Sequence, residues 1–352
     1  MAEAAPPHCD SADGFIQPIF KDGRYSNPWG GLWHEEATFR ERLKFFFGKS
    51  HANVPRSERE LDETLPILQP DLSVFALSPE TGVRHLWVGH ATSLVQFDGL
   101  TLLTDPIFSD RKSPSQAMGP KRYRKPPCSI AELPTVDCVL ISHNHYDHLD
   151  YNSVLALNKR FGDNLCWYVP MGVKKWMTDC GVQNVVECTW WQEHSHTRST
   201  DGDFKFVCTP AQHWSKRTLT DDNKTLWCSW CVKGPNHSFF FTGDTGYCPA
   251  FKTIGSHYGP FTLATIPIGA YMPRATQSRV HTDPEDGIKV HKDVRSEASI
   301  GIHWGTFHNI SKEFYLEPRE KLKELVEQQG MSSTAFITTK HGEIVLIGAN
   351  NH

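Results

Sequence analysis

The chain has 352 residues, 39% of them hydrophobic, and a formal net charge of −4. This length can hold one large domain or two smaller ones, and the slightly acidic balance argues against nucleic-acid binding. No apolar run is long enough to predict a membrane-spanning helix, and residues 1–10 lack the apolar segment of a secretory signal peptide. The ten cysteines have no disulfide-framework spacing, which predicts reduced thiols in an intracellular, cytosol-facing protein.

The first part of the chain differs in composition from the rest. Residues 1–80 are rich in proline, glycine and charge, which predicts a partly ordered N-terminal arm with one short helix at 40–47. Strand patterns begin near residue 83, so residues 81–352 are expected to form one catalytic domain. Three antiparallel strands are expected at 85–88, 93–97 and 100–104, with a hairpin turn at Asp98-Gly99. Polar and basic residues at 109–135 predict a long loop.

The remaining elements alternate between strands and helices. Strands are expected at 138–141, 169–170, 185–188, 204–208, 226–232, 238–242, 262–266, 298–302, 334–337 and 344–347. Helices are expected at 151–161, 172–180, 284–291 and 317–329. Strands that are interspersed with helices in this way favour two packed mixed sheets flanked by helices, an α/β architecture.

The strongest chemical signal is a cluster of metal-ligand residue types. Directly after the apolar run 138–141, the chain carries His143, His145, Asp147 and His148, an H-x-H-x-D-H pattern. Imidazole and carboxylate groups suit Zn²⁺ and similar metals. His143 and His145 can close on one ion, while Asp147 and His148 turn toward a second. This pattern favours a dinuclear metal site over a histidine-rich turn in solvent.

The pattern resembles the signature of the metallo-β-lactamase superfamily, which implies further ligands at other strand ends. His213 follows the strand expected at 204–208, Asp244 lies between glycines after an apolar run, and His303 follows 298–302. Taken singly, Asp244 can equally be interpreted as a turn residue, and His213 and His303 as hydrogen-bonded, half-buried histidines. Their occurrence together, in superfamily order, favours the ligand interpretation.

Longer blocks are similar to the N-acyl-phosphatidylethanolamine-hydrolysing phospholipase D family. They lie at 103–108, 113–116, 118–122, 143–153, 212–219, 243–251, 266–271 and 303–307. The similarity extends from about residue 85 to about residue 345, whereas residues 1–80 match only in patches such as Asn27-Pro28-Trp29. The resemblance implies the αββα sandwich of the metallo-β-lactamase fold.

The same resemblance implies two Zn²⁺ ions per chain and assigns their ligands. One zinc ion would be held by His143, His145, His213 and Asp244. The other would be held by Asp147, His148, Asp244 and His303, so that Asp244 bridges the two ions. Asp147 would in addition orient the attacking water molecule, which makes it a catalytic residue as well as a ligand.

Three further positions have two interpretations or depart from the family. His281 would contact the substrate phosphate or give a proton to the leaving oxygen, although it can also be a helix-entry residue. Val280 stands where relatives carry a polar residue, which puts in doubt any substrate contact from position 280. Asp105 either anchors metal-binding histidines through hydrogen bonds or caps a turn beside Pro106.

The resemblance implies hydrolysis of N-acyl-phosphatidylethanolamine to an N-acylethanolamine and phosphatidic acid. A lactonase or a thioesterase is an alternative, because a zinc-activated water molecule attacks acyl carbon as readily as phosphorus. A nuclease is disfavoured by the acidic balance. A non-catalytic membrane adaptor is disfavoured because all seven ligand positions are filled.

A lipid substrate and the family resemblance further imply a homodimer that associates peripherally with intracellular membranes, Golgi or endosomal. The basic run Lys121 to Lys125 is a candidate contact with anionic headgroups. Candidate apolar anchors are Trp29, Leu32, Trp33 and Phe45 to Phe47. The alternatives are a solvated loop and an arm that packs on the core.

Overall fold

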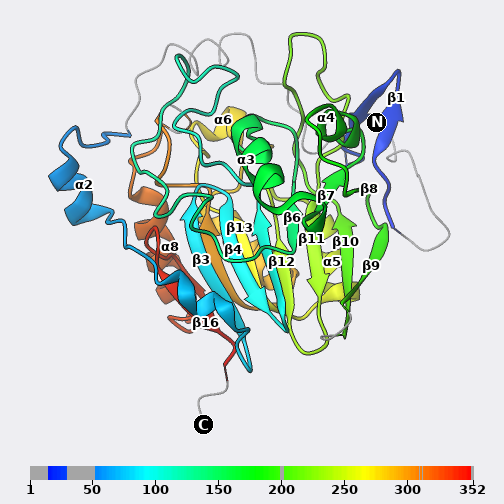
Figure 1. The fold of residues 1–352 in the computed structure, drawn as a ribbon. Coiled ribbons are helices and arrows are strands. Elements are labelled where there is room, and N and C mark those ends of the chain that lie inside the picture. Colours follow the sequence, from blue (N-terminus) through cyan, green and yellow to red (C-terminus); the bar gives the residue numbers. More distant parts are fainter. Residues whose placement is uncertain (1–14, 30–51, 199–201, 309, 311, 350–352) are drawn as a thin grey trace, which may run out of the picture.

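Two seven-stranded β-sheets lie face to face in the computed structural model (Figure 1), which describes residues 15–29, 52–198, 202–308, 310 and 312–349. The first sheet has the strand order β16-β3-β4-β5-β6-β7-β8. Its strands are β3 (Val83–Gly89), β4 (Thr92–Phe97), β5 (Leu100–Thr104), β6 (Cys138–Leu140), β7 (Cys166–Pro170), β8 (Val185–Cys188) and β16 (Ile344–Ile347).

The second sheet has the order β15-β14-β13-β12-β11-β10-β9. Its strands are β9 (Glu193–Arg198), β10 (Gly202–Thr209), β11 (Ser229–Lys233), β12 (Ser238–Phe241), β13 (Phe261–Pro267), β14 (Ser296–Ile302) and β15 (Phe336–Ile337). Both sheets are mixed. Strands β5 to β8 and β12 to β15 are parallel within their sheets, so the carboxyl ends of each set lie at one edge.

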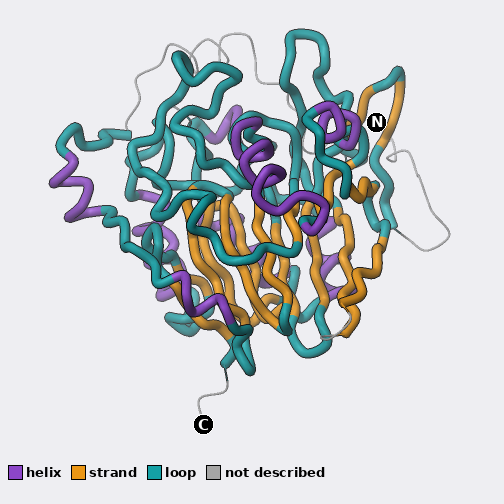
Figure 2. The backbone as a smooth tube through the Cα atoms, in the orientation of Figure 1, coloured by secondary structure: helices purple, strands orange, loops and turns teal. Residues whose placement is uncertain are grey.

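Helices flank the pair of sheets (Figures 1 and 2). They are α2 (Glu58–Thr64), α3 (Tyr151–Phe161), α4 (Lys174–Asp179), α5 (Ala250–Tyr258), α6 (Arg274–Gln277), α7 (Pro284–Asp293) and α8 (Glu317–Gln328). Val154 and Leu157 of α3 pack with Val139 and Trp167 on the outer face of the first sheet. Helices α5 and α7 contact each other, and α7 packs on β13 and β14 of the second sheet.

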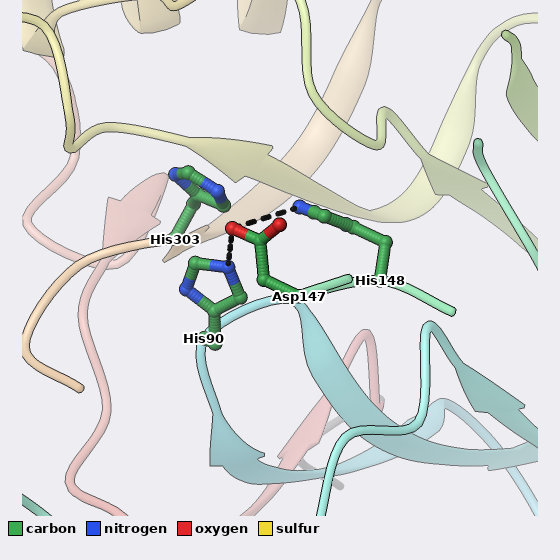
Figure 3. A group of neighbouring side chains, drawn as sticks. All are labelled: His90, Asp147, His148 and His303. Carbon is green, nitrogen blue, oxygen red and sulfur yellow. Dashed lines mark hydrogen bonds and ion pairs between the residues drawn. The ribbon is translucent and has the colours of Figure 1, made fainter. Parts of the chain in front are cut away.

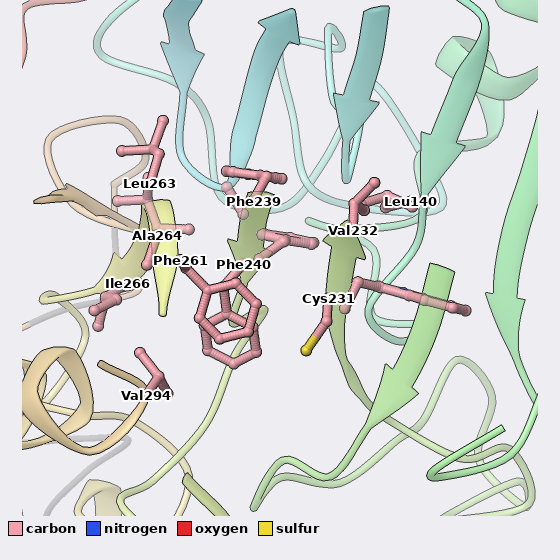
Figure 4. Close-up of a cluster of buried hydrophobic side chains, with 14 of the residues drawn as sticks. Leu140, Cys231, Val232, Phe239, Phe240, Phe261, Leu263, Ala264, Ile266 and Val294 are labelled. Carbon is pink, nitrogen blue, oxygen red and sulfur yellow. The ribbon is translucent and has the colours of Figure 1, made fainter. Parts of the chain in front are cut away.

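Aromatic side chains fill the space between the sheets. Tyr168 of β7 stacks on Phe206 of β10 with ring centroids 4.0 Å apart, so the two sheets pack directly. Strand β12 is buried along its whole length, and Phe240 stacks against Phe261 of the neighbouring strand at 5.2 Å (Figure 4). A strand covered on both faces needs a continuous apolar run rather than an alternating one, which explains the sequence Phe239 to Phe241.

The arrangement confirms the predicted class of two mixed sheets flanked by helices. Several elements were not predicted: the hairpin β1 (Ile19–Lys21) and β2 (Arg24–Ser26), strand β9, and helices α2 and α5. The strand expected at 334–337 is shorter, Phe336–Ile337. The short helix expected at 40–47 and the apolar residues Leu32, Trp33 and Phe45 to Phe47 lie outside the described residues.

Candidate metal centre

Three histidine side chains from two strand ends meet at one point. The Nε2 atom of His143 lies 2.7 Å from Nδ1 of His145, and Nε2 of His213 lies 3.2 Å from the same nitrogen. His143 and His145 follow β6 of the first sheet, whereas His213 follows β10 of the second. Packing of the two sheets therefore brings together three residues that are far apart in the sequence.

A second group of ligand atoms lies beside the first. Four side chains place one such atom each within 4.8 Å of one another (Figure 3): His90, Asp147, His148 and His303. Asp244 connects the groups, because its Oδ2 lies 3.1 Å from Nε2 of His148 and 3.8 Å from Nε2 of His213. Its Oδ1 lies 3.1 Å from Nε2 of His303. A carboxylate in this position can bridge two cations.

A tight turn after β12 gives Asp244 this position. Gly243 has a φ of +64°, in the left-handed region that favours glycine. A Cβ atom on Gly243 would lie 2.5 Å from Cβ of Ser142 and 3.1 Å from the carbonyl oxygen of Cys228. Any larger residue would therefore push the turn away from the first sheet, and Asp244 would lose its place between the two groups.

Asp105, a fully buried carboxylate at the end of β5, orients two of the histidines. Its Oδ2 accepts a hydrogen bond from Nδ1 of His148 at 2.6 Å and another from the Ser142 hydroxyl at 2.5 Å. Because that hydroxyl donates to Asp105, its oxygen accepts from Nδ1 of His143 at 2.9 Å. Both rings therefore carry a proton on Nδ1 and point Nε2 toward the cluster, where the neutral ring presents a lone pair. Of the two interpretations of Asp105, these contacts favour the anchor.

The loop before α7 holds the third histidine in the same way. Nδ1 of His213 donates to the carbonyl oxygen of Val280 at 2.9 Å, and the side chain of Gln212 donates to the carbonyl oxygen of Arg279 at 2.9 Å. Position 280 thus supports the site through its backbone. A valine in place of a polar residue leaves this contact unchanged.

The arrangement fits metal ions. Nε2 of His148 lies 3.1 Å from a carboxylate oxygen of Asp244, a contact that is repulsive for a neutral ring unless a positive charge lies between the two atoms. Nε2 of His148, Nε2 of His303 and Oδ1 of Asp244 are all buried without a hydrogen-bond partner. Buried polar atoms in this state are rare and costly. One added proton would relieve the repulsion between a single pair of atoms. Cations bound between the two groups would give all of these buried atoms a partner.

The first group of histidines is neutral. Burial lowers the pKa of His143 and His145 well below the usual range and lowers that of His213 to about 4. Neutral imidazole is the form that binds metals.

His148 is held where a positive charge is favoured. Burial alone would lower the pKa of His148, but the carboxylates of Asp244 and Asp105 outweigh it and hold this pKa well above its usual range, so without a metal a proton takes the place of a cation. Burial alone would raise the pKa of Asp147, but Lys112, His148 and His90 together outweigh it and hold this pKa well below its usual range. Asp147 is therefore a carboxylate.

His281 lies at the edge of the cluster, on the loop that enters α7. Its Nδ1 is buried without a hydrogen-bond partner and lies 3.8 Å from Oδ2 of Asp244. The ring stacks beside His303 with centroids 5.1 Å apart. The sequence-predicted ligands and His281 are thus all brought to one place.

Two residues at the centre were missed by the sequence analysis. His90, in the turn between β3 and β4, places Nε2 3.1 Å from Oδ2 of Asp147. Lys112, in the long loop after β5, places Nζ 3.0 Å from the same oxygen. A histidine directly after Gly89 in a hairpin turn was the available signal for His90. Nothing in the sequence distinguishes Lys112 from other lysines.

The basic run Lys121 to Lys125 is not the continuous charged surface that the sequence suggested. Arg122 and Arg124 are only 5% and 3% exposed. Arg122 donates to the backbone carbonyls of Ile107 and Ser109, so it holds the long loop together. Substituting either arginine would disturb folding rather than report on membrane contact.

One cavity reaches the metal-binding side chains, and a second lies beside the histidine motif. The first, of about 450 Å³, is lined by His303, Gly305 and residues of the segment after it. The second, of about 340 Å³, is lined by Asn144 and Tyr146 of the histidine motif and by Arg217, whose guanidinium packs over the rings of Tyr146 and Trp176 at 4.3 and 4.6 Å. Of the proposed ligands, His303 lines the first cavity, whereas the second is bordered only by neighbours of the ligands in the chain.

Comparison with known proteins gives consistent matches. A family profile described as "Beta-lactamase superfamily domain" matches residues 101–304. The chain is 41% identical over 341 residues to "N-acyl-phosphatidylethanolamine-hydrolyzing phospholipase D 1" of Caenorhabditis elegans, covering 94% of each chain. It is 33% identical to "N-acyl-phosphatidylethanolamine-hydrolyzing phospholipase D, mitochondrial" of Saccharomyces cerevisiae, covering 91% of this chain and 75% of the relative.

Solved structures share the fold. A metallo hydrolase from Ignicoccus hospitalis matches with a TM-score of 0.57 at 22% identity, covering 75% of this chain and 98% of that one. An isothiocyanate hydrolase from Delia radicum gut bacteria matches with a TM-score of 0.58 at 18% identity, covering 76% and 99%. At these identities the matches establish the fold alone, and they confirm the fold class expected from the sequence.

Proposed function

The chain belongs to the N-acyl-phosphatidylethanolamine-hydrolysing phospholipase D family of the beta-lactamase superfamily and is a hydrolase, and we propose that it cleaves N-acyl-phosphatidylethanolamine to an N-acylethanolamine and phosphatidic acid. The observation that carries this proposal is Asp244, whose two oxygens each lie 3.1 Å from a different histidine. That bridging arrangement suits a two-metal phosphodiesterase.

Two zinc ions are the proposed cofactors. His143, His145 and His213 would hold the first, and Asp147, His148 and His303 the second, with Asp244 shared. Nitrogen and oxygen donors of this kind are typical of zinc sites. Bound zinc lowers the pKa of a coordinated water molecule to about 7 and so supplies a nucleophile at neutral pH.

The reaction joins the oxygen of water to phosphorus and breaks the bond from phosphorus to the ethanolamine oxygen. Asp147 is a buried carboxylate, and it would accept a hydrogen bond from the attacking water molecule and orient it. His281, at the edge of the cluster, would contact a phosphoryl oxygen or give a proton to the leaving oxygen. The products are phosphatidic acid and an N-acylethanolamine.

The test uses vesicles that contain N-acylated phosphatidylethanolamine, with and without a chelator. We expect release of N-acylethanolamine and phosphatidic acid, loss of both with the chelator, and recovery when Zn²⁺ is returned. Preferential hydrolysis of soluble lactones or thioesters would replace this proposal with the alternative activity. Absence of bound metal and of any turnover would favour a non-catalytic adaptor.

We propose that the protein docks on the bilayer through the rim of the second cavity. Pro114 and Thr218 line that cavity together with Asn144 of the histidine motif. On the same two loops, the apolar side chains of Met118 and Leu219 are 73% and 93% exposed. These exposed apolar side chains would insert into the interface between headgroups and acyl chains. Among the described residues, no helix is both long and apolar enough to span a membrane.

Vesicle binding by Leu219→Asp tests this docking, with Leu77→Asp as the matched control. Leu77 is 79% exposed, but it accepts a hydrogen bond from Arg84 at the far end of β3 from the metal centre. We expect Leu219→Asp to weaken vesicle binding and Leu77→Asp to leave it unchanged. Equal binding by the two variants would contradict the assigned surface.

A homodimer that associates with Golgi or endosomal membranes is also proposed, on the family resemblance. The S. cerevisiae relative carries "mitochondrial" in its name, so imaging of a fluorescent fusion against Golgi, endosomal and mitochondrial markers decides between these membranes. Light scattering of the purified protein decides between monomer and dimer.

A further inference from the structure

Two side chains that the proposed reaction does not use meet at one oxygen of Asp147. Nε2 of His90 lies 3.1 Å from Oδ2, and Nζ of Lys112 lies 3.0 Å from the same atom. The His90 side chain is fully buried, whereas that of Lys112 is 19% exposed. Figure 3 shows His90 and His148 on either side of this oxygen, with His303 nearby.

The backbone around His90 is fixed from the opposite sheet. Its N–H donates to the hydroxyl of Thr306 at 2.8 Å, and its carbonyl oxygen accepts from the N–H of His303 at 2.9 Å and from the Trp87 indole at 3.0 Å. His90 has a φ of +53°, a left-handed conformation that costs a residue of this kind about 1–3 kcal/mol. Such strain persists only where the surroundings impose it, so the turn holds the backbone of His90 beside Asp147.

Hydrogen bonds between its two ends close the loop that carries Lys112. The backbone N–H of Lys112 donates to the carbonyl oxygen of Pro120 at 3.2 Å, and that of Arg122 donates to the carbonyl oxygen of Asp110 at 2.8 Å. The side chain of Arg111 spans the loop to the carbonyl oxygen of Gly119 at 2.5 Å. These contacts fix the position of the Lys112 backbone, from which the side chain extends to Asp147.

We infer that His90 and Lys112 form a carboxylate clamp, a pair of positioning residues that fix the orientation of Asp147 for metal binding and for the reaction. The inference rests on the proposed function only in its account of turnover. A carboxylate rotates readily about its terminal bond, and donors from two independent elements on one oxygen remove that freedom. Neither donor engages Oδ1, which stays available. Partners of this kind orient metal ligands and are worth about 10- to 100-fold in metal affinity or activity.

The test compares Lys112→Met, Lys112→Arg and His90→Phe, with Lys121→Met as the matched control. Lys121 is an exposed lysine of the same loop and does not contact the centre. Metal stoichiometry and affinity are measured by elemental analysis and chelator competition, separately from kcat and KM on substrate vesicles. A thermal melt verifies folding. If His90→Phe fails to fold, the Lys112 pair decides the question, since Lys112 lies on a loop.

We expect Lys112→Met and His90→Phe to weaken one of the two metals and to lower kcat by about 10-fold or more, with KM changed by less than about twofold. Lys112→Arg, which keeps the charge and the donor, should restore most of the loss, and Lys121→Met should resemble the wild type. Wild-type metal affinity and kcat in Lys112→Met would overturn the clamp, as would a wild-type protein that binds no metal. Weakened metal binding in a protein whose wild type leaves N-acyl-phosphatidylethanolamine intact would support the clamp and refute the proposed function.

Discussion

The buried histidines of this protein fall into two sets with different surroundings. His85, His291 and His341 each lie in the interior with one ring nitrogen 2.8–3.3 Å from a serine or threonine hydroxyl. The histidines at the strand ends face other histidines and Asp244 instead. An unpartnered nitrogen does not distinguish the sets, because Nδ1 of His85 and Nδ1 of His341 are also buried without a partner. A solitary neutral imidazole carries no charge and faces no like group, so it can stay buried with one hydroxyl as its partner. A group of imidazoles and carboxylates that face one another is stable only around positive charge, which is why the second set is the functional one.

The largest effect is expected where the two groups of ligands meet. Asp244→Asn should weaken the binding of both metals and reduce kcat by about 1,000-fold or more, equivalent to about 4 kcal/mol in the barrier, because it removes the charge that the two groups share. Elemental analysis and vesicle turnover measure the two effects. His291→Gln, in the solitary set, is the control and should keep its metals. An active Asp244→Asn protein that still binds two metals would contradict the functional role assigned to the strand-end histidines and Asp244.

Asp147→Asn should nearly abolish turnover. The amide keeps the size of the side chain but loses the charge that binds metal and the acceptor that orients water, and a loss of about 100- to 1,000-fold is expected. Turnover and zinc content are measured on the same preparation. An active variant with normal zinc content would refute the role assigned to Asp147.

His281→Ala should reduce kcat by about 100-fold, within the range for loss of one acid–base group, while both metals stay bound. This outcome would separate a residue at the edge of the cluster from the ligands within it. Unchanged kcat would show that His281 is a helix-entry residue. Loss of metal together with activity would move it into the ligand set.

The smallest effect concerns the solitary histidines and appears as acid sensitivity. Burial lowers the pKa of both His85 and His341 to about 3, below the ordinary value near 6.5. As the pH falls below about 6.5, the unfolded chain binds protons that the folded chain does not, so the free energy of unfolding decreases by up to about 1.4 kcal/mol per pH unit for each histidine. Denaturant titrations between pH 7 and pH 5 measure this slope. His85→Leu should flatten it, and an unchanged slope would contradict the assignment.

The ligands could be predicted from the sequence because residue types that bind metals stand directly after apolar runs. His143, Asp244 and His303 each follow an apolar run, and their order along the chain matches that of the superfamily ligands, so the resemblance could group them before the fold was known. The contacts of His90 and Lys112 with Asp147 could not be predicted. They arise only because the first hairpin and the long loop fold over the histidine motif, and neither residue lies in a periodic pattern with Asp147.

Tertiary contacts also explain why the sequence did not predict helix α5 or the burial of Arg122 and Arg124. Helix α5 was missed because Gly255 and its β-branched neighbours disfavour a helix; yet a Cβ atom on Gly255 would lie 1.9 Å from the carbonyl oxygen of Asp293, so the approach of α7 requires glycine. Arg122 and Arg124 looked like surface charges because a run of basic residues does not reveal that neighbouring backbone carbonyls bury one guanidinium and Asp62 pairs with the other.

The most direct test of the central claim is hydrolysis of N-acyl-phosphatidylethanolamine vesicles in isotopically labelled water, followed by mass spectrometry of the products. If the strand-end cluster delivers water to phosphorus, the heavy oxygen appears in phosphatidic acid, and the N-acylethanolamine is unlabelled. Label in a released fatty acid would mean attack on acyl carbon, and label in the N-acylethanolamine would mean cleavage at carbon rather than phosphorus. Either result would contradict the account.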